Sequence, residues 1–208
     1  MIPQNKTRGQ RKTQAPCSGC FLHKDRCLCD EIPCLDLNSK LTLIIHTREL
    51  KRTTNTGQLA LRALKNSDHY VRGLIDEPLN FTQILDPEYQ SVLFFPAEDA
   101  SLLTPEWASQ WKKPIQLLVP DGNWRQASKV FLRHPEVKIL PRVMVKPTTL
   151  QTHFLRKETK PEGLSTLQAI ALAFGALEGP DVEKKLMTLY ELKLQRTLEG
   201  RGVFHLPH

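Results

Sequence analysis

The chain has 208 residues, of which 40% are hydrophobic and 25% charged, and its formal net charge is +7 with an isoelectric point of about 9.2. This composition is that of a globular domain with a real core, and it excludes a low-complexity chain. No apolar run approaches the roughly 18 residues that a membrane span needs, and the basic, polar N-terminus lacks the apolar centre of a secretory signal. We therefore expect a cytoplasmic protein with no membrane contact.

The basic excess is concentrated near the N-terminus and favours a polyanionic partner. Residues 1–29 contain six basic residues and one acidic residue, which is +5 of the +7. We expect residues 1–14 to form a flexible basic arm. Such an arm can bind phosphate on contact, although a solvated tail without a partner gives the same pattern.

Four of the five cysteines form a C-x2-C-x6-C-x-C pattern: Cys17, Cys20, Cys27 and Cys29. Four thiolates on two short turns suit a tetrahedral zinc ion, and a site closed by four protein ligands is structural rather than catalytic. Its binding energy would fold residues 15–36, which have few apolar side chains. Two alternatives stay open, namely His23 in place of one thiol or reduced cysteines without a metal. The fifth, Cys34, is expected to be a small buried apolar residue.

The rest of the chain, residues 37–208, alternates apolar strands with helices. Continuous apolar runs rich in β-branched residues predict strands that are covered on both faces, which is typical of a parallel sheet. The expected strands lie at 41–47, near Val71–Leu74, at 91–95, at 115–119 and at 137–145, where Pro141 stops the last one. The first expected helix follows a cap at Thr54, Asn55 or Thr56. Further helices are expected from about Trp124 to Phe131, from Ser165 or Thr166, and over Pro180–Leu198. The alternation predicts an α/β domain whose largely parallel sheet is flanked by helices.

Three of the expected strands end beside a proline, at Phe95–Pro96, Val119–Pro120 and Leu140–Pro141. In parallel sheets, ligands bind beyond the carboxyl ends of the strands. The segment "PDGNW" therefore places Asp121 and Trp124 where a binding site is expected.

Several short motifs follow one another along the chain: "CSGC" with "CLC", "HTRELKRTTNTG", "LFFPAEDA", "DGNW", "LPR", and "LR" before "GLSTLQA". Together they resemble the DTW-domain family, the tRNA-uridine aminocarboxypropyltransferases, from Cys17 to about Leu177. The resemblance implies a fold like that of the SPOUT methyltransferases, whose chain forms a trefoil knot.

The resemblance also implies the reaction, the cofactor and the partner. The 3-amino-3-carboxypropyl group of S-adenosylmethionine moves to the ring imide nitrogen of a tRNA uridine and leaves methylthioadenosine. Zinc then has an architectural role, because the sulfonium is already a good leaving group and needs no metal. No obligate protein partner is indicated. Three positions depart from the family pattern: Asn123 replaces the usual threonine, Gln168 a glutamate and Ala97 a serine. For Asn123 we expect a turn-stabilising role, which asparagine supports as well.

Asp121 is the expected catalytic residue, and three roles are open to it. It can take the imide proton as a general base, hold the ammonium of the cofactor's arm in the attack geometry, or make a structural loop contact. Trp124 can stack on the target base or on adenine, or pack in the core.

Further motif residues complete the expected cofactor site. Leu118, Leu140 and Leu164 would sandwich the adenine, and Arg142 would meet the cofactor carboxylate or tRNA. Helix capping alone also explains Ser165 and Thr166. The full expected cofactor set is Pro96, Leu118, Asp121, Trp124, Leu140, Arg142, Leu164, Ser165 and Thr166.

The expected tRNA contacts are Arg52, Arg125, Lys129 and Arg156. Arg52 lies beside a helix start, where an arginine can clamp a phosphate or a carboxylate. Arg125 and Lys129 share one helix face, which is equally typical of a solvated surface. His46 is interpreted as a hydrogen-bonded histidine at a strand end rather than as a catalyst.

Two rival functions compete with aminocarboxypropyl transfer. An enzyme with the same fold and cofactor could transfer the methyl group instead, because sub-ångström placement decides which carbon is attacked. A non-catalytic, zinc-containing RNA-binding module would also explain the charge, although no paired aromatic residues typical of RNA stacking are found.

Overall fold

The computed structural model describes residues 16–50, 52–146 and 163–203, and within them six parallel strands form one sheet in the order β2-β1-β5-β3-β6-β4. The strands are β1 (Lys40–His46), β2 (Ser67–Arg72), β3 (Gln90–Phe94), β4 (Ser101–Leu102), β5 (Ile115–Asp121) and β6 (Arg142–Met144). The α-helices are α1 (Gly57–Ala63), α2 (Phe81–Ile84), α3 (Pro105–Ala108), α4 (Trp124–Arg133), α5 (Pro135–Lys138), α6 (Thr166–Glu178) and α7 (Pro180–Glu199), with 3-10 turns η1 (Lys24–Arg26), η2 (Cys29–Glu31) and η3 (Thr47–Glu49).

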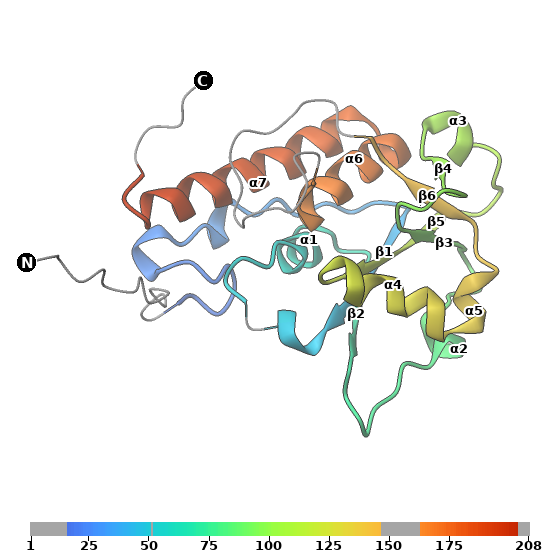
Figure 1. The fold of residues 1–208 in the computed structure, drawn as a ribbon. Coiled ribbons are helices and arrows are strands. Elements are labelled where there is room, and N and C mark those ends of the chain that lie inside the picture. Colours follow the sequence, from blue (N-terminus) through green and yellow to red (C-terminus); the bar gives the residue numbers. More distant parts are fainter. Residues whose placement is uncertain (1–15, 51, 147–162, 204–208) are drawn as a thin grey trace, which may run out of the picture.

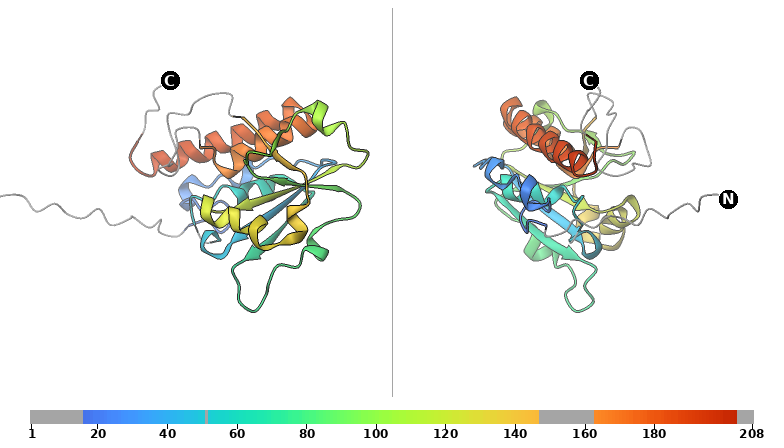
Figure 2. Two further views of the ribbon diagram at one scale, coloured as in Figure 1. Left: turned by 45° about the vertical axis from the view of Figure 1, so that its right-hand side comes forward. Right: turned by 90° about the vertical axis from the view of Figure 1, so that its left-hand side faces the viewer.

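The helices cover both faces of the sheet (Figure 1). Helices α1, α6 and α7 share one apolar cluster with Leu117 and Val119 of β5, and α2, α4 and α5 share a second cluster with Leu118. Figure 2 shows the long pair α6 and α7 on one side of the sheet and α4 on the other. Successive side chains of a strand point to opposite faces, so β5 is buried on both. The predicted α/β fold is confirmed, while the SPOUT relation and the knot stay predictions.

The prediction of a strand at 137–145 stopped by Pro141 is wrong. Helix α5 covers Pro135–Lys138 and so includes the first residues of the predicted strand. Strand β6 begins at Arg142, directly after Pro141. Pro135 favours the helix, because proline suits the first helical position. Pro141 cannot donate a ladder hydrogen bond, but its carbonyl accepts one from the Leu93 backbone N–H at 2.9 Å, so it precedes the strand without disrupting it.

The short strand predicted near Val71–Leu74 lies earlier, at Ser67–Arg72. It ends at Arg72, and the next residue, Gly73, has a φ of +93°, a left-handed conformation that favours glycine. β2 is an edge strand and its residues are half-buried or exposed, which explains why its apolar pattern is weak.

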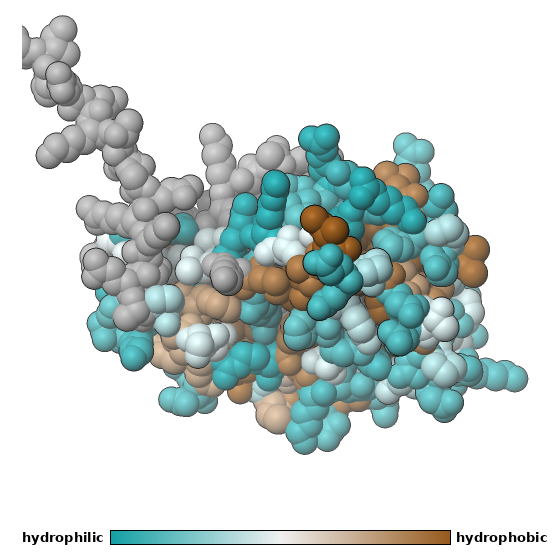
Figure 3. Space-filling view, turned by 90° about the horizontal axis from the view of Figure 1, so that it is seen from below, coloured by the Kyte–Doolittle hydropathy of each residue, from teal (hydrophilic) through white to brown (hydrophobic). Residues whose placement is uncertain are grey.

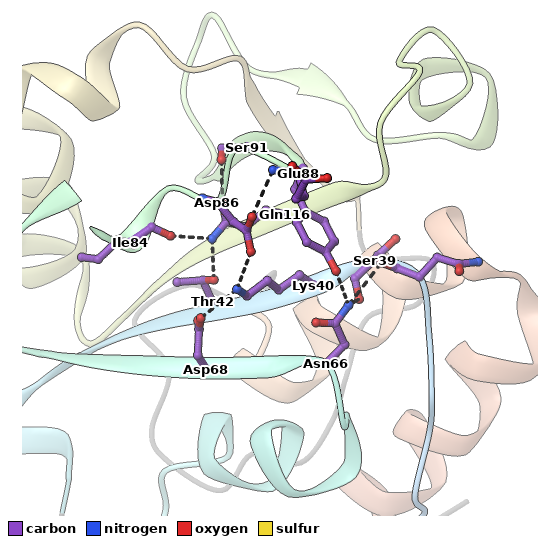
Figure 4. A network of polar contacts seen from close by, with 12 residues as sticks. Ser39, Lys40, Thr42, Asn66, Asp68, Ile84, Asp86, Glu88, Ser91 and Gln116 are labelled. Carbon is purple, nitrogen blue, oxygen red and sulfur yellow. Dashed lines mark hydrogen bonds and ion pairs between the residues drawn. The ribbon is translucent and has the colours of Figure 1, made fainter. Parts of the chain in front are cut away.

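A buried polar network joins three strands near the amino ends of the sheet (Figure 4). The fully buried Gln116 side chain donates to Thr42 Oγ1 at 2.9 Å and to the Ile84 carbonyl at 2.7 Å. Its oxygen accepts from Ser91 Oγ at 2.6 Å and from the Asp86 backbone N–H at 3.0 Å. All four hydrogen-bonding positions of this amide are therefore satisfied, as burial of a polar group requires.

Lys40 extends the network by contacting two carboxylates, Asp86 at 3.0 Å and Asp68 at 3.2 Å. These contacts join β1 to β2 and to the segment before β3. The amino ends of the sheet are thus held by structural polar contacts, and the candidate site lies at the opposite, carboxyl ends.

The surface seen in Figure 3 is largely hydrophilic, with separate apolar patches. The most exposed large apolar side chains of the described residues are Ile75, after β2, and Ile139, after α5.

Candidate active site and metal centre

Asp121 is the last residue of the central strand β5 and is buried, with 8% of its surface exposed. The strand continues through Pro120, so it ends later than the expected stop at Val119. The Asp121 carboxylate accepts a hydrogen bond from Asn55 Nδ2 at 2.7 Å and one from Thr166 Oγ1 at 2.6 Å. Three segments that are distant in the sequence therefore meet at one carboxylate.

Asn55 belongs to the candidate site, although the sequence predicts it only as a helix cap. The residue is buried, with 2% of its surface exposed, and its side-chain oxygen accepts hydrogen bonds from the backbone N–H groups of Gly57 at 2.8 Å and Gln58 at 3.4 Å. The neighbouring Thr56 accepts from the Leu167 backbone N–H at 3.1 Å. The polar loop before α1 thus connects α1, α6 and Asp121, and the signal for it in the sequence is the cluster of small polar residues in "TTNTG".

The first turn of α6 borders Asp121. Ser165 caps α6 in a reciprocal arrangement: its hydroxyl accepts from the Gln168 backbone N–H at 3.3 Å, and the Gln168 side-chain oxygen accepts from the Ser165 backbone N–H at 3.0 Å. Capping therefore explains Ser165, whereas Thr166 points its hydroxyl to Asp121. The partial positive charge at a helix N-terminus stabilises a carboxylate placed there.

The "DGN" turn holds Asp121 at the start of α4. Asn123 caps α4, since its oxygen accepts from the Gln126 backbone N–H at 2.9 Å and the Gln126 side chain accepts from the Asn123 backbone N–H at 2.9 Å. A Cβ on Gly122 would lie 2.8 Å from the Gln126 side-chain oxygen. The turn-stabilising role expected for Asn123 is confirmed.

The four cysteines of the N-terminal pattern form a compact cluster whose sulfur atoms all lie within 4.8 Å of one another. Sγ of Cys17 is 3.5 Å from those of Cys27 and Cys29, and Sγ of Cys20 is 3.7 Å from that of Cys27. These distances are too long for a disulfide, whose sulfur atoms lie about 2.05 Å apart. They fit a tetrahedral zinc site, in which bonds of about 2.3 Å put the sulfur atoms about 3.8 Å apart.

The surroundings of the thiols shift their pKa values in opposite directions. The backbone N–H groups of Cys20 and Gly19 lower the pKa of the Cys17 thiol to about 6. At Cys27 the backbone N–H of Cys29 lowers the pKa, but the neighbouring thiols and burial raise it by more, to about 12. Thiolate is the form that binds metal, so a bound cation would favour ionisation of the whole cluster.

The other residues considered for the metal site lie elsewhere. His23 caps η1 and contacts Asp25, with its Nδ1 3.0 Å from the carboxylate. Cys34 is exposed, so the prediction that it is buried is wrong; the adjacent Leu35 occupies the core instead and pairs with Leu64.

The family model described as DTW domain matches residues 14–198. The chain belongs to the DTW domain family.

Curated relatives match over most of this DTW domain. The tRNA-uridine aminocarboxypropyltransferase 2 of Macaca fascicularis is 24% identical over 176 residues, which are 80% of this chain and 58% of that protein. The protein of the same name from Mus musculus is 24% identical over 171 residues, 78% of this chain and 56% of that protein. The protein of the same name from Drosophila melanogaster is 23% identical over 175 residues, which are 81% of this chain and 68% of that protein. The chain thus spans less than two thirds of the length of the first two relatives.

A solved structure is also similar. The SAM-dependent rRNA:acp-transferase Tsr3 from Vulcanisaeta distributa has a TM-score of 0.47 and 17% identity, covering 79% of this chain and 80% of that one.

The apolar residues expected to sandwich adenine do not form one cluster in the DTW domain. Leu118 is completely buried on the sheet face opposite to Asp121, and Leu140 is half-buried against the same cluster. Pro96 is exposed after β3, and Leu164 is half-buried before α6 and belongs to neither apolar cluster of the described residues. The adenine contacts stay a prediction.

The basic residues expected to bind ligands have varied surroundings. Arg142 forms an ion pair with Asp99 and lies over the Phe131 ring at 5.4 Å. Arg52 is exposed and pairs with the buried Glu49 at 3.2 Å.

The remaining predicted residues belong to α4 or to undescribed parts of the chain. Arg125 is exposed and Lys129 half-buried, both on α4. Arg156 and the side chain of Trp124 lie outside the described residues, so their roles stay predictions.

Cationic side chains surround the cysteine cluster, and the sequence pattern did not reveal them. Arg62 Nη1 donates to Cys29 Sγ at 2.9 Å, and a Cβ on Gly19 would collide with this guanidinium. Lys193 of α7 is completely buried and donates to the Cys20 carbonyl at 2.6 Å. Both cations would offset the negative charge of a tetrathiolate metal centre.

Among the described residues, no helix is long and apolar enough to cross a membrane.

Proposed function

We propose that this DTW-domain protein transfers the 3-amino-3-carboxypropyl group of S-adenosylmethionine to the ring imide nitrogen of a tRNA uridine. Membership of the family supports the proposal, as do the names of relatives that are 23–24% identical over about four fifths of the chain. The observation that carries it is the buried Asp121 carboxylate at the carboxyl end of the central strand, held by Asn55 and Thr166.

The bound cosubstrate supplies a sulfonium that makes the first methylene of its amino-acid arm electrophilic. The bond from the imide nitrogen to this methylene forms as the C–S bond breaks, and methylthioadenosine leaves. The imide proton passes to a base or to water. The part that we assign to Asp121 is to hold the ammonium of that arm. Asn55 and Thr166 fix the plane of the carboxylate, so a cation beside it is held in one orientation. Proton abstraction by Asp121 is the alternative role.

We further propose that the cysteine cluster holds a structural zinc ion. The sulfur spacing fits a tetrahedral site, and four protein ligands leave no open position for substrate. The ion would order residues 15–36 against the catalytic domain, which we place at residues 37–208, and residues 1–14 would add a basic arm for tRNA.

Product analysis tests the reaction. Purified protein is incubated with S-adenosylmethionine and an unmodified tRNA transcript, and the nucleosides and the nucleoside coproduct are measured by mass spectrometry. We expect aminocarboxypropyl-uridine and methylthioadenosine in equal amounts. Methylated uridine with S-adenosylhomocysteine would favour the rival methyl transfer, and tRNA binding without either product would favour the non-catalytic module.

A further inference from the structure

A second feature of the carboxyl edge lies on the opposite face of the sheet from Asp121. His46 and Arg72 are the last residues of β1 and β2 and are paired in register. Ile44 and Tyr70, two residues earlier on each strand, contact the apolar cluster beneath α4. Since side chains two apart on a strand share a face, His46 and Arg72 point to the same side as α4.

Arg72 is a half-buried cation to which the described residues offer no carboxylate within ion-pair distance. Its Nη1 donates to the backbone carbonyl of Gln126 in α4 at 2.8 Å. Burial, and then the charge of Arg133, lower the pKa of the Arg72 guanidinium. Burying a charge is costly unless an opposite charge compensates it.

Further cations converge on the same place. Burial lowers the pKa of His46, and Arg72, Arg48 and Lys129 lower it further, against the opposing effect of Glu49. Glu49 is itself paired with Arg52 at 3.2 Å.

The second histidine of this surface shows the same pattern. Burial lowers the pKa of His134; Glu136 opposes this effect, and Arg72 and Arg133 add to it. Arg72 on β2, Arg48 in the turn η3, and Lys129 and Arg133 on α4 thus act on the two histidines at the ends of β1 and α4, and Glu49 and Glu136 are the acidic groups that oppose them.

A phosphate group suits the charge and the donors of this surface. Guanidinium groups bind phosphate oxygens with two parallel hydrogen bonds, and the imidazoles add donors once they are protonated. The surface also adjoins the candidate active site, because Ile45, the residue before His46, pairs with Asp121 across β1 and β5.

We propose that Arg72, surrounded by His46, Lys129 and Arg133, binds a backbone phosphate of the RNA substrate next to the active site. This inference rests on the proposed function, because tRNA is taken as the substrate. It adds Arg72 and Arg133 to the expected tRNA contacts, and it assigns Lys129, which was already among them, to this phosphate.

The test compares Arg72→Gln with Lys184→Gln, which removes one charge from an exposed position on α7, across the sheet from α4. The dissociation constant for an unmodified tRNA transcript is measured between about 50 and 200 mM salt. Arg72→Gln should bind about tenfold more weakly, and the slope of log K against log salt should become shallower by about 1. Lys184→Gln should stay within about twofold of wild type.

A second variant and a second ligand guard against a folding defect. Arg133→Gln, at an exposed position of α4, should lower the salt slope in the same way, and inorganic phosphate should protect wild type against thermal unfolding more than it protects Arg72→Gln. Wild-type affinity and salt slope in both variants would overturn the site.

The product assay distinguishes this inference from the proposed function. Protein that binds tRNA through Arg72 but transfers nothing supports the phosphate site and contradicts the reaction. Protein that transfers normally, with tRNA affinity unchanged in Arg72→Gln and Arg133→Gln, overturns the phosphate site alone.

Discussion

Asp121 accepts hydrogen bonds from two side chains that lie 66 and 45 positions away in the sequence. The place of Asp121 could be predicted, because an acid directly after a buried apolar run stands at a strand end. Its partners could not, because a hydrogen bond between Asn55 and Asp121 depends on how β1, β5 and the loop before α1 pack. Sequence patterns report which face a residue occupies, not which distant group it meets.

Replacing Asp121 with asparagine should prevent transfer and weaken donor binding, because the variant keeps the shape but loses the charge that we assign to the donor's ammonium. Isothermal titration with S-adenosylmethionine measures the affinity, and Asp76→Asn, at an exposed loop position, is the control. Wild-type donor affinity in Asp121→Asn with transfer abolished would favour the general-base role instead.

Thr166→Val tests the hydroxyl that donates to Asp121 and keeps the branched shape of the side chain. Loss of one hydrogen bond to a charged group costs about 1.5 kcal/mol, so we expect donor affinity to fall about tenfold. Thr197→Val removes a hydroxyl that donates to the Lys193 carbonyl at 2.7 Å, on α7, and should leave donor affinity unchanged. Equal effects of the two variants would argue against a role for Thr166 at the site.

At the scale of elements, helices with clear caps were the most predictable. Helix α6 begins after Ser165, as its cap predicts, and α7 covers Pro180–Glu199 against the predicted Pro180–Leu198. The segment 137–145 was not predictable in this way, since its short apolar runs fit a helix or a strand equally well and tertiary packing decides.

The cap of α4 gives a test of the residue that departs from the family pattern. Asn123→Ala should lower the free energy of unfolding by about 1 kcal/mol, because it removes the oxygen that accepts from the Gln126 backbone N–H. Asn123→Thr should cost less than about 0.5 kcal/mol and keep turnover, since threonine also caps helices. Urea unfolding measures both, and lost turnover in a stably folded Asn123→Thr would assign a chemical role to the amide.

At the scale of the whole molecule, the order of the strands and the position of the cysteine segment lay beyond the sequence pattern. Cys20, Leu22 and Leu28 belong to the same core cluster as Leu186 of α7, more than 150 positions away. Lys193 and Arg196 of α7 also donate to main-chain carbonyls of the cysteine segment. Periodicity shows which residues are buried but not that the two ends of a chain meet.

The metal centre should therefore stabilise the whole fold. Wild type and Cys34→Ser, which changes the exposed cysteine outside the cluster, should each hold one zinc ion per chain. Cys17→Ser should hold much less and unfold at a lower temperature, because a structural site contributes its binding energy to folding. Metal analysis and thermal unfolding measure these effects; full zinc content in Cys17→Ser would contradict the four-cysteine site.

The most direct test of the central claim follows two labels from the donor into tRNA. S-adenosylmethionine labelled in the carboxyl group of its amino-acid arm is compared with donor labelled in the methyl group, using wild type and Asp121→Asn. The account predicts that wild type transfers the carboxyl label and not the methyl label, and that Asp121→Asn transfers neither. Transfer of the methyl label by wild type, or undiminished transfer of the carboxyl label by Asp121→Asn, would contradict it.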